Sequence, residues 1–111
     1  MTEEHILLAR QEEGRKIVAS KLPSWAENMS ILFPAKISLE QCSSEATALY
    51  KASLVSGESL VDLTGGFGVD CSFLSKNFSS VDYVEQNEEL CQIAEHNFKA
   101  LGLNIRVNNA E

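Results

Sequence analysis

The chain has 111 residues, of which 44% are hydrophobic and 23% charged, and its net charge is −7. This composition is typical of a folded globular domain and excludes a disordered or collagen-like chain. A chain of this length buries roughly two thirds of its unfolded surface in one core, which excludes two full domains. Its apolar runs are far shorter than the ~20 residues of a membrane span, and its first residues lack the basic head of a signal peptide. We therefore expect a cytoplasmic protein without a membrane contact.

The acidic charge is concentrated in one half of the chain. Residues 1–56 carry six bases and seven acids, whereas residues 57–111 carry three bases and nine acids. Binding to nucleic acid is driven by clustered Lys and Arg side chains, so the second half is a poor platform for a polyanion. An RNA partner would have to be held by regions outside this chain.

The cysteines and histidines show no spacing that indicates a disulfide or a metal site. The cysteines are isolated from one another, at Cys42, Cys71 and Cys91. His5 and His96 fall on charged faces of expected helices and are interpreted as solvated. We expect no bound metal.

Residues 1–56 are predicted to form an N-terminal helical region. A helix is predicted over residues 3–22, because apolar residues recur within one arc at ~100° per residue, and Pro23 is expected to end it. The arc consists of Ile6, Leu7, Gly14, Ile17, Val18 and Leu22. A short helical turn is expected at residues 24–29, where Trp25 is interpreted as a packing anchor.

A second helix is predicted to start at Ser38 and to run to about Val55. Ser38 and Gln41 have the spacing of a capping box, in which each side chain bonds to the backbone amide of the other residue. Apolar residues then recur every three or four positions, at Leu39, Cys42, Ala46 and Leu49. Ser56 and Gly57 are expected to stop the helix.

From Glu58 the pattern changes to alternating strands and helices. Strands are predicted over residues 59–63, 80–85 and 104–108, and helices over residues 70–76 and 88–101. Asn87 is the expected N-cap of the last helix, and Gly102 is its expected C-terminal cap. The alternation predicts parallel strands, so residues 57–111 are expected to form the first half of a doubly wound, Rossmann-like α/β sheet.

A cofactor site is predicted where the first two of these strands end. The first strand leads into the loop Asp62-Leu63-Thr64-Gly65-Gly66-Phe67-Gly68. Glycines let a backbone come close to a ligand, and the helix that follows offers amides to an anionic group. An acid at the end of the second strand, here Glu85, can accept both hydroxyls of a ribose. Together these features indicate a nucleoside cofactor.

The residues around the loop favour S-adenosylmethionine over a nicotinamide dinucleotide. A dinucleotide fingerprint has a third small residue where this chain has Cys71, and Asp62 would serve a pyrophosphate poorly. The frame Asp-x-Thr-x-Gly-x-Gly instead resembles the first motif of class I S-adenosylmethionine-dependent methyltransferases. Residues 84–87 resemble their ribose-binding strand end, and residues 94–103 resemble the helix and turn before their third strand. The resemblance covers about half of the chain.

The resemblance implies a role for each matching residue. Asp62, Gly66 and Gly68 would line the methionine end and the centre of the cofactor. Glu85 would bind the ribose, and Gln86 would lie beside the adenine. Asn109 stands where these enzymes often have an acid facing the adenine amine, and an amide oxygen can accept the same hydrogen bond. The candidate cofactor-binding residues are Asp62, Thr64, Gly65, Gly66, Phe67, Gly68, Glu85, Gln86 and Asn109.

Two further matches imply an RNA substrate. Thr64 stands where many family members have glycine, and with Asp70 the frame is similar to that of some RNA guanine methyltransferases. Residues 41–51 resemble a helix that precedes this motif in bacterial methyltransferases with THUMP-like RNA-binding regions. The resemblance therefore implies a methyltransferase that acts on RNA, with a guanine base as the candidate acceptor.

A full methyltransferase sheet has further strands after the third, and its acceptor motif follows the fourth. We therefore expect residues 57–111 to be the cofactor half of a truncated domain that is inactive alone, and no catalytic residue is assigned. An incomplete sheet with an exposed edge is also expected to favour self-association. A non-catalytic nucleotide-binding or assembly module with the same fold is the alternative.

Overall fold

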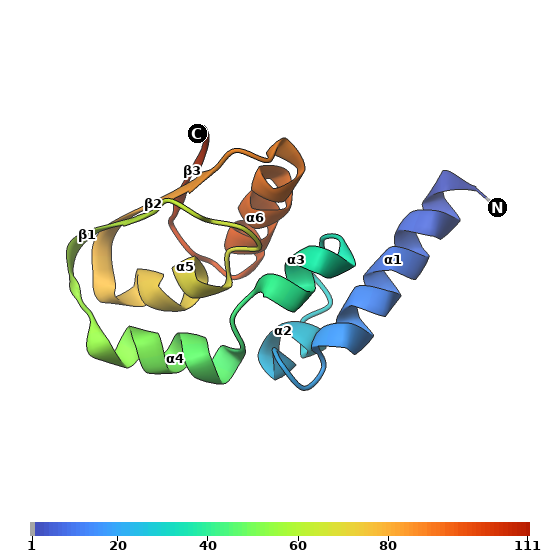
Figure 1. The fold of residues 1–111 in the computed structure, drawn as a ribbon, viewed down its shortest axis with the longest axis horizontal. Coiled ribbons are helices and arrows are strands. Elements are labelled where there is room, and N and C mark those ends of the chain that lie inside the picture. The colour runs from blue at the N-terminus through green and yellow to red at the C-terminus, as the bar shows by residue number, and fades with distance from the viewer. Residues whose placement is uncertain (1) are drawn as a thin grey trace.

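The computed structural model describes residues 2–111 as a long first helix and three shorter helices, followed by a parallel sheet with its own helices (Figure 1). The elements are α1 (Glu3–Val18), α2 (Pro23–Glu27), α3 (Lys36–Gln41), α4 (Glu45–Leu54), β1 (Gly57–Asp62), α5 (Val69–Leu74), the 3₁₀ helix η1 (Ser75–Asn77), β2 (Phe78–Glu85), α6 (Glu88–Ala100) and β3 (Arg106–Asn109). The strand order is β1-β2-β3, and both pairs are parallel. The predicted Rossmann-like half-sheet after an N-terminal helical region is confirmed.

The register of the strands places their carboxyl ends at one edge of the sheet. Asp62 at the end of β1 lies opposite Tyr83, and Glu85 at the end of β2 lies opposite Asn109. Asn87 caps α6 as predicted, because its side chain accepts the amide of Leu90 at 3.0 Å. The loops that follow the strands therefore meet at the edge where the sequence places the cofactor.

The first helix differs from its prediction at both ends of the apolar arc. α1 ends at Val18, before Pro23, and Pro23 is the first residue of α2. Proline is tolerated there because the amide at the first position of a helix has no partner within the helix. Val18 is buried, whereas Ile6 and Leu7 are 55% and 52% exposed. The first turns of α1 border an open groove against α6, so little packs on them.

The predicted second helix is two helices, and the predicted capping box is wrong. Ala35 is the N-cap of α3, and Ser38 lies inside that helix. The chain leaves the helical conformation at Cys42 and re-enters it after Ser44, whose hydroxyl accepts the amide of Thr47 at 3.1 Å. The N-cap at Ser44 thus starts a new helix in the middle of the predicted one.

The helical region packs directly against the sheet half. Trp25 is 2% exposed and meets the ring of Phe67 edge to face, with centroids 5.1 Å apart, which confirms it as a packing anchor. On the other side, the Asn97 amide of α6 donates to the Leu32 carbonyl at 2.9 Å and accepts the Leu32 amide at 2.8 Å. Phe67 belongs to the glycine-rich loop, so the packing of the helices also positions that loop.

The cysteines are free thiols, at Cys42, Cys71 and Cys91. Burial raises the pKa of the Cys71 thiol to about 12, and the negative charges of Asp62 and Asp70 add to the rise.

Residues 2–111 contain no group of three His, Cys, Asp or Glu side chains that could hold a metal ion. No helix in the same range is long and apolar enough to cross a bilayer.

Candidate functional site

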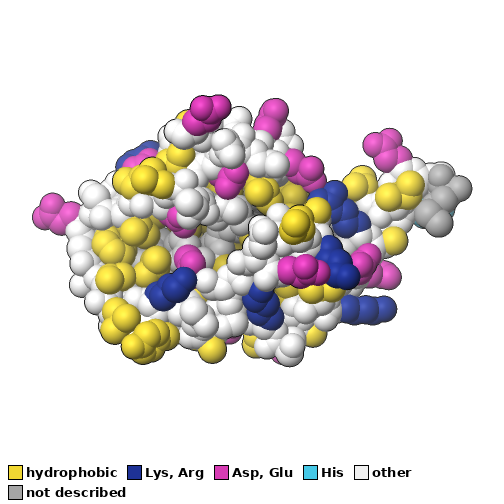
Figure 2. Space-filling model, viewed as in Figure 1, with side chains coloured by type: hydrophobic (Ala, Val, Ile, Leu, Met, Phe, Trp, Pro, Cys, Tyr) yellow, Lys and Arg dark blue, Asp and Glu magenta, His cyan; other side chains and the backbone are white. Residues whose placement is uncertain are grey.

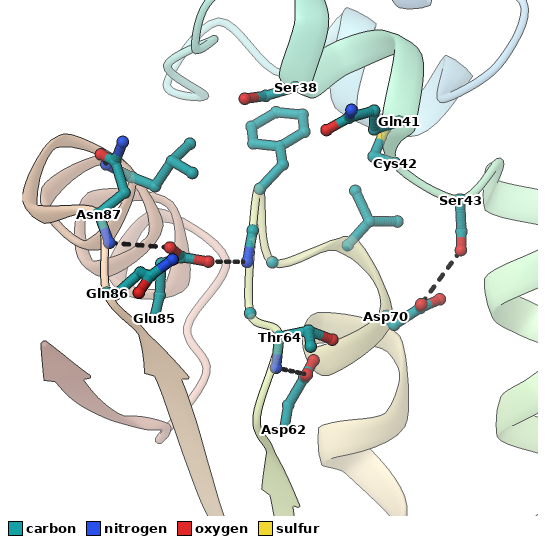
Figure 3. Close-up of a pocket in the computed structure, with 16 residues that line it drawn as sticks. Ser38, Gln41, Cys42, Ser43, Asp62, Thr64, Asp70, Glu85, Gln86 and Asn87 are labelled. Atoms are coloured by element: carbon teal, nitrogen blue, oxygen red, sulfur yellow. Dashed lines mark hydrogen bonds between the residues drawn. The ribbon is translucent and has the colours of Figure 1, made fainter. Parts of the chain in front are cut away.

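An open cavity of about 610 Å³ lies at the carboxyl ends of β1 and β2 (Figure 3). Its volume is within the range of roughly 300–1,000 Å³ that is usual for ligand pockets. The lining brings together eight of the predicted residues: Asp62, Thr64, Gly65, Gly66, Phe67, Gly68, Glu85 and Gln86. Asn109 is outside this lining.

The loop between β1 and α5 is a tight turn fastened to β2. The amide of Gly65 donates to the carbonyl of Val84 at 3.0 Å, and the amide of Gly68 donates back to Gly65 at 2.9 Å. Gly66 and Gly68 have φ angles of +52° and +88°. Glycine adopts this left-handed region without the clash that a β-carbon would cause.

The loop glycines serve different neighbours. A β-carbon on Gly65 would collide with the ring of Tyr83, and one on Gly68 would lie 3.0 Å from the ring of Phe98. The absence of a side chain at Gly65 and Gly68 therefore lets the buried rings of Tyr83 and Phe98 pack directly against the loop. At Gly66 the same position is open, with only the Thr64 carbonyl within 4 Å, at 3.6 Å. Gly66 is therefore the loop glycine whose missing side chain leaves room for a ligand.

Glu85 bridges the two loops that form the site. One carboxylate oxygen accepts the amide of Gly66 at 2.9 Å, and the other accepts the amide of Asn87 at 2.8 Å. Figure 3 shows both bonds, with the carboxylate between the loops. Each carboxylate oxygen has two lone pairs, so each keeps one acceptor position for a ligand hydroxyl. The side chain is held in place before any ligand arrives.

Asp62 gives the lower part of the cavity a negative charge that is partly desolvated. Its carboxylate accepts the amide of Thr64 at 3.1 Å. Burial raises the pKa of the Asp62 carboxyl, the charges of Asp70 and Glu85 add to the rise, and the Thr64 amide opposes it. A cationic ligand group would stabilise the ionised Asp62 carboxylate, whereas the same carboxylate would repel a phosphate.

The opposite wall of the cavity comes from the N-terminal helical region, which the sequence did not predict. Ser38 and Gln41 of α3 lie across from the glycine loop in Figure 3. Beside them, Asp70 at the start of α5 accepts the hydroxyl of Ser43 at 3.1 Å and the amine of Lys51 at 3.0 Å. Asp70 therefore holds the helical region against the sheet half. The spacing of residues in the sequence does not indicate that α3 lies opposite the glycine-rich loop.

Gln86 borders a second hollow next to the first, and Asn109 directly precedes Ala110 of its lining. This hollow has a volume of about 290 Å³ and is lined by Leu63, Thr64, Glu85, Gln86, Ala110 and Glu111. The amide nitrogen of Asn109 donates to the carbonyls of Glu85 and Gln86, both at 3.0 Å. The side-chain nitrogen of Asn109 is therefore used in bonds within the protein, and its amide oxygen is the acceptor that it can offer to a ligand.

A glycine-rich loop after β1, an acid at the end of β2 and a cavity at their shared edge are the features of the first half of a Rossmann-like α/β fold. Over 97% of the chain, this fold matches the crystal structure of a "putative methyltransferase" from Porphyromonas gingivalis W83, with a TM-score of 0.84 and 38% sequence identity. The chain thus has a methyltransferase fold, and it spans 28% of the length of that protein. No protein-family model matches the chain, and no curated protein does.

Proposed function

We propose that this chain is the S-adenosylmethionine-binding portion of a class I methyltransferase. The observation that carries the proposal is the Glu85 carboxylate, which backbone amides hold at 2.9 Å and 2.8 Å beside an open cavity. An acid fixed in this way at the end of the second strand can accept both hydroxyls of a ribose. The 38% identity with a protein described as a methyltransferase supports the class of activity.

The residues present fit each part of the cofactor. The ribose would lie on Glu85, and the adenine would lie beside Gln86 in the adjoining hollow, with its amine on the Asn109 oxygen. The methionine end would extend toward Asp62, whose pKa is raised by burial and by the charges of Asp70 and Glu85. Bound there, S-adenosylmethionine would supply a methyl group from its sulfonium centre. The chain's own acids stabilise that positive charge.

The acceptor we propose is RNA, with a guanine base as the candidate. The proposal rests on the similarity of the extended frame, which ends at Asp70, to that of some RNA guanine methyltransferases. Residues 57–111 carry nine acids and three bases, so the RNA would be bound by regions outside this chain.

The test of the cofactor is a calorimetric titration with S-adenosylhomocysteine, S-adenosylmethionine and NAD. We expect both adenosyl ligands to bind more tightly than NAD, because Asp62 disfavours a pyrophosphate and Cys71 stands at the third position of the dinucleotide frame. Preferential binding of NAD would contradict the proposal. Transfer of a labelled methyl group to RNA by the full-length protein tests the acceptor. Ligand binding without transfer to any substrate would favour a non-catalytic module.

A further inference from the structure

We infer that Tyr83 is a positioning residue for the cofactor loop: its hydroxyl fixes the orientation of the peptide between Gly66 and Phe67 without touching the cofactor. The inference rests on the proposed function for its ligand, but the geometry of the loop carries it. The Tyr83 hydroxyl donates to the carbonyl of Gly66 at 2.6 Å. The Tyr83 ring is fully buried and packs edge to face on Phe98, with centroids 5.4 Å apart.

Tyr83 and Glu85 act on the same residue from the same strand. Side chains two positions apart on a strand lie on one face of the sheet, so both reach the loop above that face. Glu85 accepts the amide of Gly66, and Tyr83 donates to its carbonyl. The two contacts together fix a residue that has no side chain of its own to hold it. Glycine at φ +52° would otherwise exchange readily with other conformations.

The orientation of this peptide decides where the next amide points. The C=O and N–H of a trans peptide lie in one plane and point in opposite directions, so anchoring the Gly66 carbonyl on Tyr83 turns the Phe67 amide away from Tyr83. Within residues 2–111 the Phe67 amide donates no hydrogen bond, although Phe67 borders the cavity. It is therefore a loop donor that is available to a ligand.

Tyr83 also keeps this role over the whole physiological pH range. Burial raises the pKa of the Tyr83 hydroxyl above its usual range, and the nearby groups of Cys91 and Glu85 add to the rise. The charged and titratable groups around it, which include Asp62 and Cys71, all act in this direction. The hydroxyl therefore remains a protonated donor.

The experiment compares Tyr83→Phe with Tyr50→Phe in the full-length protein, well below the melting temperature. Tyr50 is 66% exposed on α4 and is a matched control for the loss of one hydroxyl. We expect Tyr83→Phe to bind S-adenosylhomocysteine about two- to tenfold more weakly, as the loss of one hydrogen bond predicts. Amide hydrogen exchange should also become faster at residues 66–68 and remain unchanged in α6, while Tyr50→Phe matches the parent in both.

A purely structural role would give a different result. Exchange would then become faster throughout the core, including α6, and the folded protein would bind the ligand as the parent does. Either unchanged affinity or unchanged loop exchange in Tyr83→Phe would overturn the inference. If the parent itself binds no adenosyl ligand, the proposed function fails, and the exchange of residues 66–68 still decides the role of Tyr83.

Discussion

The carboxylate of Glu85 accepts the backbone amide of Gly66 at 2.9 Å, across the gap between the end of β2 and the glycine-rich loop. The same carboxylate accepts the amide of Asn87, so one side chain ties together both loops of the site. A solvated strand end would be expected to change stability little on substitution. That expectation does not hold for Glu85, because its oxygens satisfy two backbone amides. The order of both loops therefore depends on one side chain, and on the proposed function the same side chain would bind the ribose.

Glu85→Ala should weaken the binding of S-adenosylhomocysteine by roughly ten- to several-hundred-fold, because both ribose acceptors are lost. It should also lower the free energy of unfolding by about 1–3 kcal/mol, since the amides of Gly66 and Asn87 lose their acceptor. Calorimetry and denaturant unfolding measure the two effects.

The matched control is Glu88→Ala, an exposed acid at the first position of α6 whose loss removes the same charge. It should bind like the parent. Equal binding by the two variants in the full-length protein would remove Glu85 from the ribose site.

Asp62→Asn should stabilise the protein at neutral pH. The pKa of Asp62 is raised in the folded state, so its ionisation opposes folding, and this penalty grows as the pH rises through the folded pKa. Asn keeps an oxygen for the Thr64 amide but carries no charge. The variant should melt above the parent at pH 7, and the difference should vanish as the pH falls toward 3.8, the ordinary pKa of the carboxyl.

The same variant should lose affinity for cationic S-adenosylmethionine more than for the neutral thioether S-adenosylhomocysteine. Thermal melts from pH 7 to pH 4 and paired titrations provide the check. A variant that melts below the parent at pH 7 would show that the Asp62 charge stabilises the fold.

Gly65→Ala should destabilise the protein by about 1–3 kcal/mol or more, because the new methyl group would collide with the buried ring of Tyr83. Gly57→Ala is the control: its β-carbon would lie 3.3 Å from the edge of the Phe78 ring, and its φ is not in the left-handed region. Thermal unfolding compares the two. Equal melting temperatures would show that the loop can move away from Tyr83 at no cost.

Self-association of residues 1–111 is a further proposal that the exposed surface supports. Hydrophobic side chains gather over α4 and β1 in Figure 2, and β1 is an edge strand. The exposed apolar residues of this surface are Leu49, Tyr50, Leu54, Val55 and Val61. Such a surface with an unpaired strand edge favours association. Light scattering should show a mass that rises with concentration, and Val61→Lys should reduce the rise. A monomer at every concentration would contradict the proposal.

The positions of the loop residues at the edge of the sheet were more predictable than the helices before them, for a physical reason. Loop glycines and the acid at Glu85 lie where parallel strands must end together, so alternation of strands and helices placed them correctly. The predicted cap at Ser38 is wrong because α3 already begins after Ala35, and Ser44 caps a separate helix, α4. Ile6 is exposed although it belongs to the predicted apolar arc, because an amphipathic pattern does not show whether another element covers that arc. The contact of Tyr83 with the loop is tertiary and leaves no pattern in the sequence.

The position of the bound ligand is the most direct test of the proposed cofactor site. Amide chemical shifts recorded during titration of the protein with S-adenosylhomocysteine give that position residue by residue. We predict that the largest changes lie at residues 64–68 and 85–87, with smaller changes at Ser38 and Gln41 across the cavity. Changes confined to the groove between α1 and α6, or none at saturating ligand, would contradict the assignment of the site.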